Sequence, residues 1–175
     1  MANYYATPRR EGNVLVKGVE LPVVYFEAWE QLEPEIESFK PDYIISFGLA
    51  PLARGVRFER AARNEDEGYR DNNRQRHEGS IILGGPDLLY SDLPIDDLIE
   101  RMESSSITAS ASTDAGGYLC NHVFYFVMYY CMQHPEIRGG FVYMPSWPVE
   151  GNGEETQMSV LKIILNEIEE ETLER

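Results

Sequence analysis

Short strand-like runs alternate with helix-length segments along most of this chain, and this alternation restricts its fold more than any other feature. Compact runs at Tyr43–Phe47, Ile107–Ser112 and Gly140–Met144 predict strands, the first of them ending at Gly48. The segments predicted to be helices are Glu27–Phe39, Pro94–Met102, Leu119–Gln133 and Glu154–Leu173. The order predicts an α/β fold, a three-layer α/β/α sandwich around a mostly parallel twisted sheet.

Two other segments complete the predicted organisation. The apolar run from Val14 to Tyr25 predicts an extended strand, and the polar run Asn64–Gly85 predicts a long surface excursion. The sequence contains neither an internal repeat nor a low-complexity linker. We therefore expect residues 1–175 to form a single domain.

Charge and composition exclude several classes of partner. The net charge of −15 opposes binding to nucleic acid, and no basic stripe is present. No apolar run is long enough to span a membrane, and the first residues do not resemble a signal peptide, so we expect a cytoplasmic protein. The 2 cysteines and 3 histidines show no metal-binding spacing, and we expect no metal or other cofactor.

Cys120 is the strongest candidate for a reactive group. A small, Gly-rich turn at Thr113–Gly117 leads directly into the apolar segment, which places Cys120 in the first turn of the predicted helix. There the helix dipole and the backbone N–H groups favour a thiolate, which is a nucleophile. For a lone cysteine the commoner role is that of a small apolar side chain opening a buried helix, and the family resemblance described next is what favours the nucleophile.

Eight segments, in the same order along the chain, resemble the pyroglutamyl peptidase I family of cysteine peptidases. They are Leu21–Tyr25 (LPVVY), Pro41–Ala50 (PD, a strand, then GxA), Glu59–Asn64 (ERxAxN), Asp71–Asn72 (DN), Gly84–Pro86 (GGP), Leu93–Pro94 (LP), Ala115–His122 (family AGTFxCNH) and Arg138–Pro145 (family RGGFIHxP). The resemblance covers most of the chain. It implies an exopeptidase that removes N-terminal pyroglutamate from peptides.

The resemblance also implies roles for individual residues. Cys120 is the nucleophile by position, Glu59 is the acid that orients the base, and Tyr143 occupies the position of the family's base histidine. A phenol has a pKa of about 10, so Tyr143 is a poor base at neutral pH. We therefore expect impaired catalysis or, alternatively, an inactive member that binds a small lactam-like ligand or a protein.

Substrate-binding positions and substitute bases follow from the same resemblance. It places Leu49, Asn64 and Tyr118 among the residues that contact the substrate. His122 faces the side of the helix opposite Cys120, which predicts a structural role. His77, in the polar run, remains a candidate for a substitute base.

The family opens with a strand carrying a TGF-x-PF-G motif, which Met1–Gly12 does not contain. We therefore expect the sheet to close a gap, to leave an exposed edge, or to borrow a strand from a partner. The resemblance and this edge together predict a homo-oligomer whose interface lies near Val14–Tyr25 or the Tyr4–Tyr5 pair.

Overall fold

The fold is built on a four-stranded sheet with the strand order β3-β10-β4-β9. A computed structural model describes residues 5–146 and 153–173. The strands of the sheet are β3 (Tyr43–Ala50), β10 (Arg138–Pro145), β4 (Val56–Glu59) and β9 (Ala109–Ser112). Strand β10 runs parallel to β3 and antiparallel to β4, and β4 runs parallel to β9, so the sheet is mixed but mainly parallel.

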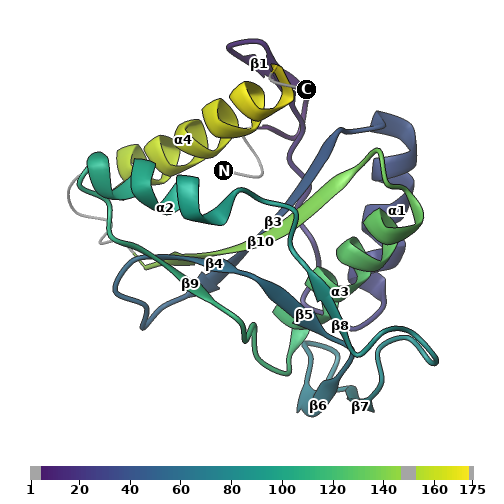
Figure 1. Ribbon diagram of the computed structural model, residues 1–175. Coiled ribbons are helices and arrows are strands. Elements are labelled where there is room, and N and C mark those ends of the chain that lie inside the picture. The colour runs from purple at the N-terminus through teal and green to yellow at the C-terminus, as the bar shows by residue number, and fades with distance from the viewer. Residues whose placement is uncertain (1–4, 147–152, 174–175) are drawn as a thin grey trace.

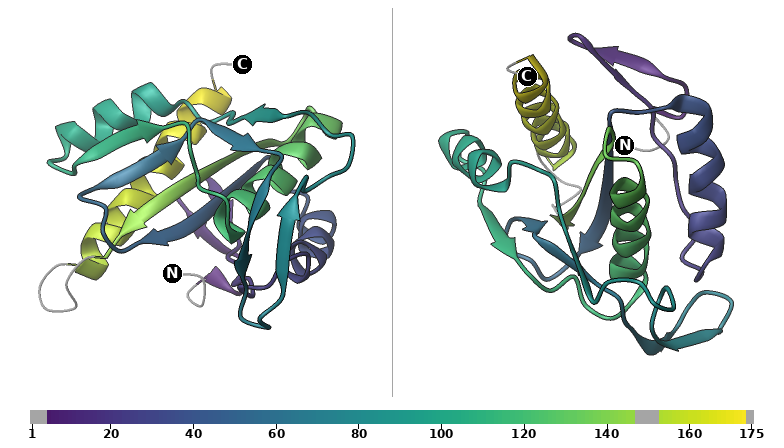
Figure 2. Two further views of the ribbon diagram at one scale, coloured as in Figure 1. Left: turned by 90° about the horizontal axis from the view of Figure 1, so that it is seen from below. Right: turned by 45° about the vertical axis from the view of Figure 1, so that its right-hand side comes forward.

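Helices cover both faces of this sheet. On one side lie α1 (Glu27–Phe39) and α3 (Leu119–Gln133), and on the other lie α2 (Ile95–Ser104) and α4 (Gly153–Leu173) (Figures 1 and 2). Each side has its own apolar cluster against the sheet, the first built around α3 and the second around α2 and α4. The predicted three-layer α/β/α sandwich is confirmed.

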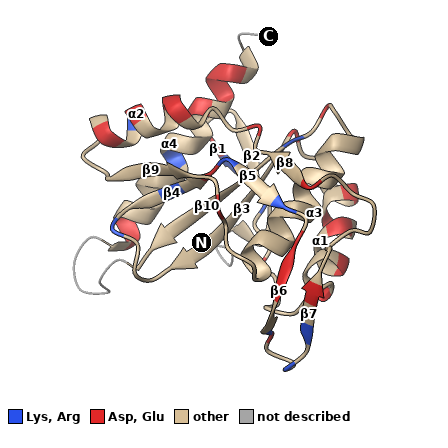
Figure 3. Ribbon diagram, turned by 60° about the horizontal axis from the view of Figure 1, so that its bottom comes forward, with Lys and Arg blue, Asp and Glu red and all other residues tan. Residues whose placement is uncertain are grey.

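Three short ribbons surround the main sheet. They are β1 (Arg9–Glu11) with β2 (Val14–Val16), β5 (Ala61–Arg63) with β8 (Leu88–Tyr90), and β6 (Asp66–Arg70) with β7 (Arg76–Gly79). The last ribbon lies inside the predicted surface excursion Asn64–Gly85, which is therefore not a plain loop (Figure 3). The sequence of this segment does not show the alternation of polar and apolar residues that predicts a strand, because the inward-facing, buried positions include the charged residues Asp66 and Asp71.

Strand β9 begins two residues later than predicted and β10 extends beyond both predicted ends, and two further strands differ in ways that have a clear cause. Val14–Val16 is a strand, but the continuation to Tyr25 is not, because Pro22 has no N–H and the Val23 carbonyl accepts from the Asn72 N–H at 3.0 Å. Strand β3 does not stop at Gly48; the pairing with β10 continues to Ala50.

Strand β3 forms an edge of the main sheet. Within residues 5–146 and 153–173 no strand pairs with its other side, so the expected exposed edge is present. Tyr5 is only 2% exposed and donates its hydroxyl to Glu11, so its side chain faces the interior of the chain, and Tyr4 lies outside the described residues. No helix in the described part of the chain is long and apolar enough to cross a membrane.

Candidate active site

The turn before α3 places Cys120 in the first turn of the helix, as predicted. Gly116 has a φ of 80°, a left-handed conformation that glycine adopts without strain. At Gly117 an added Cβ would lie 2.2 Å from the Glu67 side chain, so only glycine fits. These two positions explain why a Gly-rich turn precedes the cysteine.

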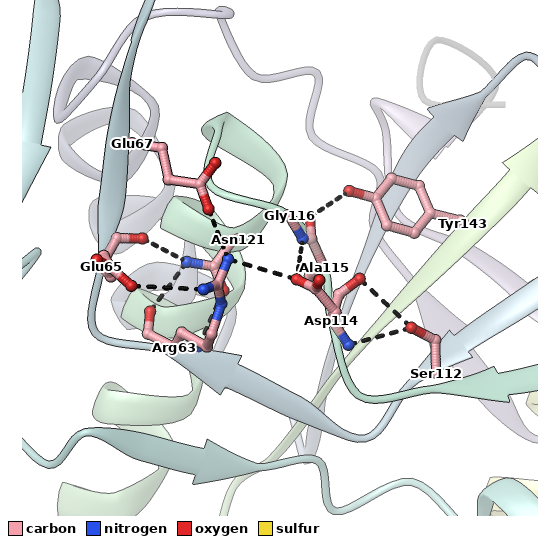
Figure 4. Close-up of polar contacts among 9 residues, drawn as sticks. All are labelled: Arg63, Glu65, Glu67, Ser112, Asp114, Ala115, Gly116, Asn121 and Tyr143. Carbon is pink, nitrogen blue, oxygen red and sulfur yellow. Dashed lines mark hydrogen bonds and ion pairs between the residues drawn. The ribbon is translucent and has the colours of Figure 1, made fainter.

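Polar contacts fix the same turn from both ends. Ser112 Oγ accepts from the Asp114 N–H at 3.1 Å, and Asp114 Oδ1 accepts from the Gly116 N–H at 3.0 Å (Figure 4). Asn121, next to Cys120, is fully buried and donates its amide to the carbonyls of Arg63 and Glu65. Asn121 ties the start of α3 to the neighbouring ribbons, a role that the sequence reasoning missed although the residue lies within the cysteine motif.

Glu59 and Tyr143 both lie near Cys120, although the three residues are far apart in sequence. Tyr143 pairs with Arg57 across β10 and β4, and Glu59 is the next residue of β4 on the same face. A Cβ added to Gly48 would lie 3.0 Å from Tyr143 Cε1 and 3.1 Å from Cys120 Sγ. The absence of a side chain at Gly48 therefore allows the thiol and the phenol ring to approach each other.

The Tyr143 hydroxyl interacts with two groups of the site, the Ala115 carbonyl and Cys120. It donates its single proton to the Ala115 carbonyl at 2.7 Å (Figure 4). The hydroxyl also interacts with Cys120, and this hydrogen bond lowers the pKa of the thiol and raises that of the phenol, as expected when a phenol O–H donates to a thiolate. Burial, followed by the neighbouring Cys120 and Glu59, raises the pKa of Tyr143 far above its usual value. The phenol therefore stays protonated at neutral pH and does not act as a base.

Glu59 has one oxygen without a partner. Its side chain is fully buried, and Oε1 accepts from Arg57 Nε at 2.8 Å, whereas Oε2 has no hydrogen bond from any described residue. The guanidinium of Arg57 also lies over the Tyr143 ring, 4.6 Å from its centroid. A buried, unpaired carboxylate oxygen is unfavourable for folding, and such groups gather at functional sites.

The pKa of Cys120 is raised, which corrects the expectation of a readily formed thiolate. Burial is the largest cause and the negative charge of Glu59 adds to the rise, whereas the hydrogen bond with Tyr143 and the positive charge of Arg57 oppose it. The N-cap residue Tyr118 makes no side-chain capping bond, so it leaves the first-turn N–H groups available to a ligand oxygen. Cys120 is a free, half-buried thiol.

The three predicted substrate-binding residues differ in how accessible they are. Leu49 is 64% exposed near the end of β3. Tyr118 is half-buried and donates its hydroxyl to the Arg70 carbonyl at 3.0 Å. Asn64 donates its amide to the carbonyls of Ile82 and Gly85 and accepts from the Ile82 N–H, so it holds a surface turn in place. These bonds use both amide protons of Asn64, which leaves it without a donor for a substrate.

His122 and His77 share a carboxylate on the other side of the α3 N-terminus. Asp66 Oδ2 lies 2.6 Å from Nδ1 of His122 and 2.8 Å from Nδ1 of His77. The structural role predicted for His122 fits this pairing and its complete burial. His77 is paired with Asp66 and not with Cys120, which argues against its use as a substitute base.

The same three residues are the one group in the described part of the chain that has the composition and spacing for a metal ion. Their ligand atoms lie within 4.8 Å of one another, and Asp66 Oδ1 has no hydrogen-bond partner there. Both short contacts have ordinary hydrogen-bond lengths, so each histidine is paired with Asp66 Oδ2 without an ion. The sequence reasoning missed this cluster because its members are separated by 11 and 56 positions from Asp66.

A groove of about 950 Å³ reaches Cys120 from the open side of β3. Its lining includes Val23, Phe47, Phe141 and Cys120 itself, and most of its other side chains are also apolar. The groove therefore gives a ligand in solution a route to the thiol.

Comparison with known proteins places this arrangement in a family. A family model described as pyroglutamyl peptidase matches residues 8–168. The pyrrolidone-carboxylate peptidase of Fusobacterium nucleatum is 35% identical over 162 residues, which is 90% of this chain and 76% of that protein. The crystal structure of pyroglutamyl peptidase I from Bacillus amyloliquefaciens superposes with a TM-score of 0.85 at 30% identity, covering 93% of this chain and 82% of the other.

A mutant pyrrolidone carboxyl peptidase from P. furiosus gives a TM-score of 0.86 at 29% identity, covering 94% of this chain and 86% of that one. Sequence and structure therefore agree over nearly the whole described chain. The chain belongs to the pyroglutamyl peptidase family.

Proposed function

We propose that this protein is a cysteine exopeptidase that removes N-terminal pyroglutamate, with Cys120 as its nucleophile and with weak catalysis. The observation that carries the proposal is the convergence of Cys120 of α3 and Tyr143 of β10 beside Gly48, with Glu59 of β4 close enough for its charge to raise the pKa of both. Each of the three belongs to a different motif of the family resemblance, and the groove beside them gives a peptide access to the thiol.

In the proposed reaction, the Cys120 thiolate attacks the carbonyl carbon that joins pyroglutamate to the next residue. A sulfur–carbon bond forms, and the oxygen takes up negative charge near the first-turn N–H groups of α3. The carbon–nitrogen bond then breaks, and the leaving amine takes a proton. Water hydrolyses the thioester, releases pyroglutamate and restores the thiol.

Weak catalysis follows from the groups around the thiol. Tyr143 stands at the family's base position, its proton is donated to Ala115, and burial raises the pKa of both Tyr143 and Cys120. At neutral pH Cys120 is therefore a thiolate in only a small fraction of the molecules, and no described imidazole is hydrogen-bonded to its sulfur. The loss of a general base lowers rates by about 10²–10⁴-fold.

Hydrolysis of a chromogenic pyroglutamyl amide tests the proposal. Cys120→Ala should lower the rate by at least about 10³-fold, since removal of a nucleophile abolishes the covalent route. The matched control is Cys131→Ala, which changes the other thiol of α3, a buried group turned toward Gly139. Hydrolysis that survives Cys120→Ala would exclude a cysteine mechanism at this site.

A second candidate is a module that binds a pyroglutamyl or lactam-like group without turnover. The raised pKa of Cys120 and the engaged proton of Tyr143 favour it. Calorimetric titration of pyroglutamate distinguishes the two functions, because a binding module shows saturable heat but no amide hydrolysis.

Assembly and compartment stay predictions. With Tyr5 buried, the homo-oligomer interface is confined to the neighbourhood of Val14–Tyr25, and sedimentation at micromolar concentration decides whether it forms. The two free thiols support a reducing compartment such as the cytoplasm, since a catalytic cysteine must remain reduced there.

A further inference from the structure

A cluster of one aspartate and two histidines lies apart from the thiol, on the other side of the α3 N-terminus. Asp66 and His77 belong to the β6–β7 hairpin, and His122 belongs to the first turn of α3. Asp66 and His122 are buried, whereas the His77 side chain is 27% exposed. One ligand atom from each residue lies within 4.8 Å of the other two. Two imidazoles and one carboxylate are a donor set that suits Zn²⁺ and related divalent transition metals.

The hydrogen bonds within the cluster leave one strong acceptor unused. Both imidazoles contact the same oxygen of Asp66, Oδ2, at 2.6 Å from His122 and 2.8 Å from His77. The other oxygen, Oδ1, is buried and has no partner among the described residues. A buried carboxylate oxygen without a partner is unfavourable, and a bound cation removes that cost. This oxygen is independent of the cluster's composition and indicates a positively charged ligand.

Aromatic rings enclose the cluster. The centroid of the Phe26 ring lies 4.9 Å from that of each imidazole, and the Tyr25 ring lies 5.1 Å from that of His122. Tyr25 Oη is also buried without a partner in the part of the chain that the structure describes. Such an enclosure limits the access of water and holds the imidazoles in orientation, as the surroundings of protein metal sites do. The partial exposure of His77 provides an entry path for an ion.

We propose that Asp66, His77 and His122 bind a single divalent transition-metal ion of the Zn²⁺ class, with Nδ1 of each imidazole and the carboxylate as ligands. The ion has a structural role, because it joins the β6–β7 hairpin to α3. The inference is independent of the proposed peptidase activity. The net charge of −15 favours the approach of cations, whereas Ca²⁺ and Mg²⁺ prefer sites made of oxygen ligands.

Binding requires two local changes. Zinc bonds of about 2.0 Å in a tetrahedron separate neighbouring ligand atoms by about 3.3 Å, so the imidazole contacts of 2.6 and 2.8 Å with Asp66 must lengthen. In the ion-free form, His122 carries its proton on Nδ1, because Nε2 accepts from the Phe26 N–H at 3.3 Å. When the ion takes Nδ1, this proton moves to Nε2 and faces the Phe26 N–H. We therefore expect metal binding to break the Phe26 hydrogen bond.

Calorimetric titration with Zn²⁺ tests the proposal. All measurements use the Cys120→Ala protein, because an accessible thiol is itself a zinc ligand. His77→Ala removes a ligand at a partly exposed position, and Asp66→Asn removes the charge while keeping the shape of the side chain. The matched control is His134→Ala, which removes an imidazole that is 41% exposed and paired with Glu136. Circular dichroism checks that each variant is folded.

We expect saturable binding of a single Zn²⁺, with an affinity that falls at least about tenfold in His77→Ala and in Asp66→Asn and is unchanged in His134→Ala. Excess Mg²⁺ should not displace the zinc. Hydrogen exchange of the Phe26 amide should become faster when zinc binds. Absence of saturable binding, equal affinity in His77→Ala, displacement by Mg²⁺, or unchanged exchange at Phe26 would each overturn the proposal.

Discussion

Cys120 and His122 are two positions apart at the start of α3, yet they lie in opposite kinds of environment. On the His122 side, one carboxylate oxygen of Asp66 bonds two imidazoles, and the Phe26 N–H completes the other nitrogen of His122. On the Cys120 side, the phenol bonds to a backbone carbonyl and the acid keeps an unpaired oxygen. Each side keeps one buried carboxylate oxygen without a partner among the described residues, Asp66 Oδ1 and Glu59 Oε2. The two sides differ in that Asp66 bonds two imidazoles, whereas Glu59 bonds a guanidinium and no imidazole.

The largest expected difference between the His122 side and the Cys120 side is in stability, and His122→Ala should show it. The change leaves the buried Asp66 carboxylate with one partner and creates a cavity, so we expect a loss of about 3 kcal/mol in the free energy of unfolding. Cys120→Ala should change stability by less than about 1 kcal/mol, because the side chain is only half-buried. Urea denaturation measures both.

The control for this comparison is His134→Ala. That side chain is 41% exposed and pairs with Glu136 at 3.5 Å, so its removal should cost little. If His122→Ala and His134→Ala unfold at the same urea concentration, the Asp66 pairing does not stabilise the fold.

The contrast also shows what the sequence could and could not reveal. The Gly-rich turn and the apolar helix predicted the position of Cys120, because both signals are local. The Asp66 cluster depends on the β6–β7 hairpin, which brings residues together without any spacing rule. The predicted strand at Leu21–Tyr25 failed for a related reason: strand propensity alone does not supply a pairing partner, and here the neighbouring space is a groove.

The protonation of Cys120 was the other point that local patterns missed. The helix N-terminus predicted a favoured thiolate, but burial and Glu59 outweigh that effect. Neither the depth of Cys120 nor the position of Glu59 on the adjacent strand can be read from residues close to it in sequence.

Tyr143→His should give the Cys120 side the imidazole base that it lacks. An imidazole titrates near neutrality, and Glu59 Oε2, which has no partner among the described residues, is available as an acceptor. We expect hydrolysis of the pyroglutamyl amide to rise by about 10²-fold, the lower end of the range for a general base.

Tyr143→Phe is the matched control, because it removes the hydroxyl that donates to Ala115 but adds no base. It should leave the rate near that of the unaltered protein. A histidine variant no faster than the phenylalanine variant would show that Tyr143 does not limit catalysis.

The smallest effects should appear in the pH dependence of Cys120 alkylation by iodoacetamide. Only the thiolate reacts, so the rate rises with pH, and the raised pKa places its midpoint above the usual value for a thiol of about 8.5. Glu59→Gln removes a negative charge and should lower the midpoint, whereas Arg57→Gln removes a positive charge and should raise it. Cys131 serves as the internal reference, because its pKa is raised to about 12 by burial and it should react only on unfolding. Mass spectrometry of the labelled peptides follows each thiol separately. Midpoints that move in the same direction in both variants would show that Glu59 and Arg57 do not act on the thiol through their charges.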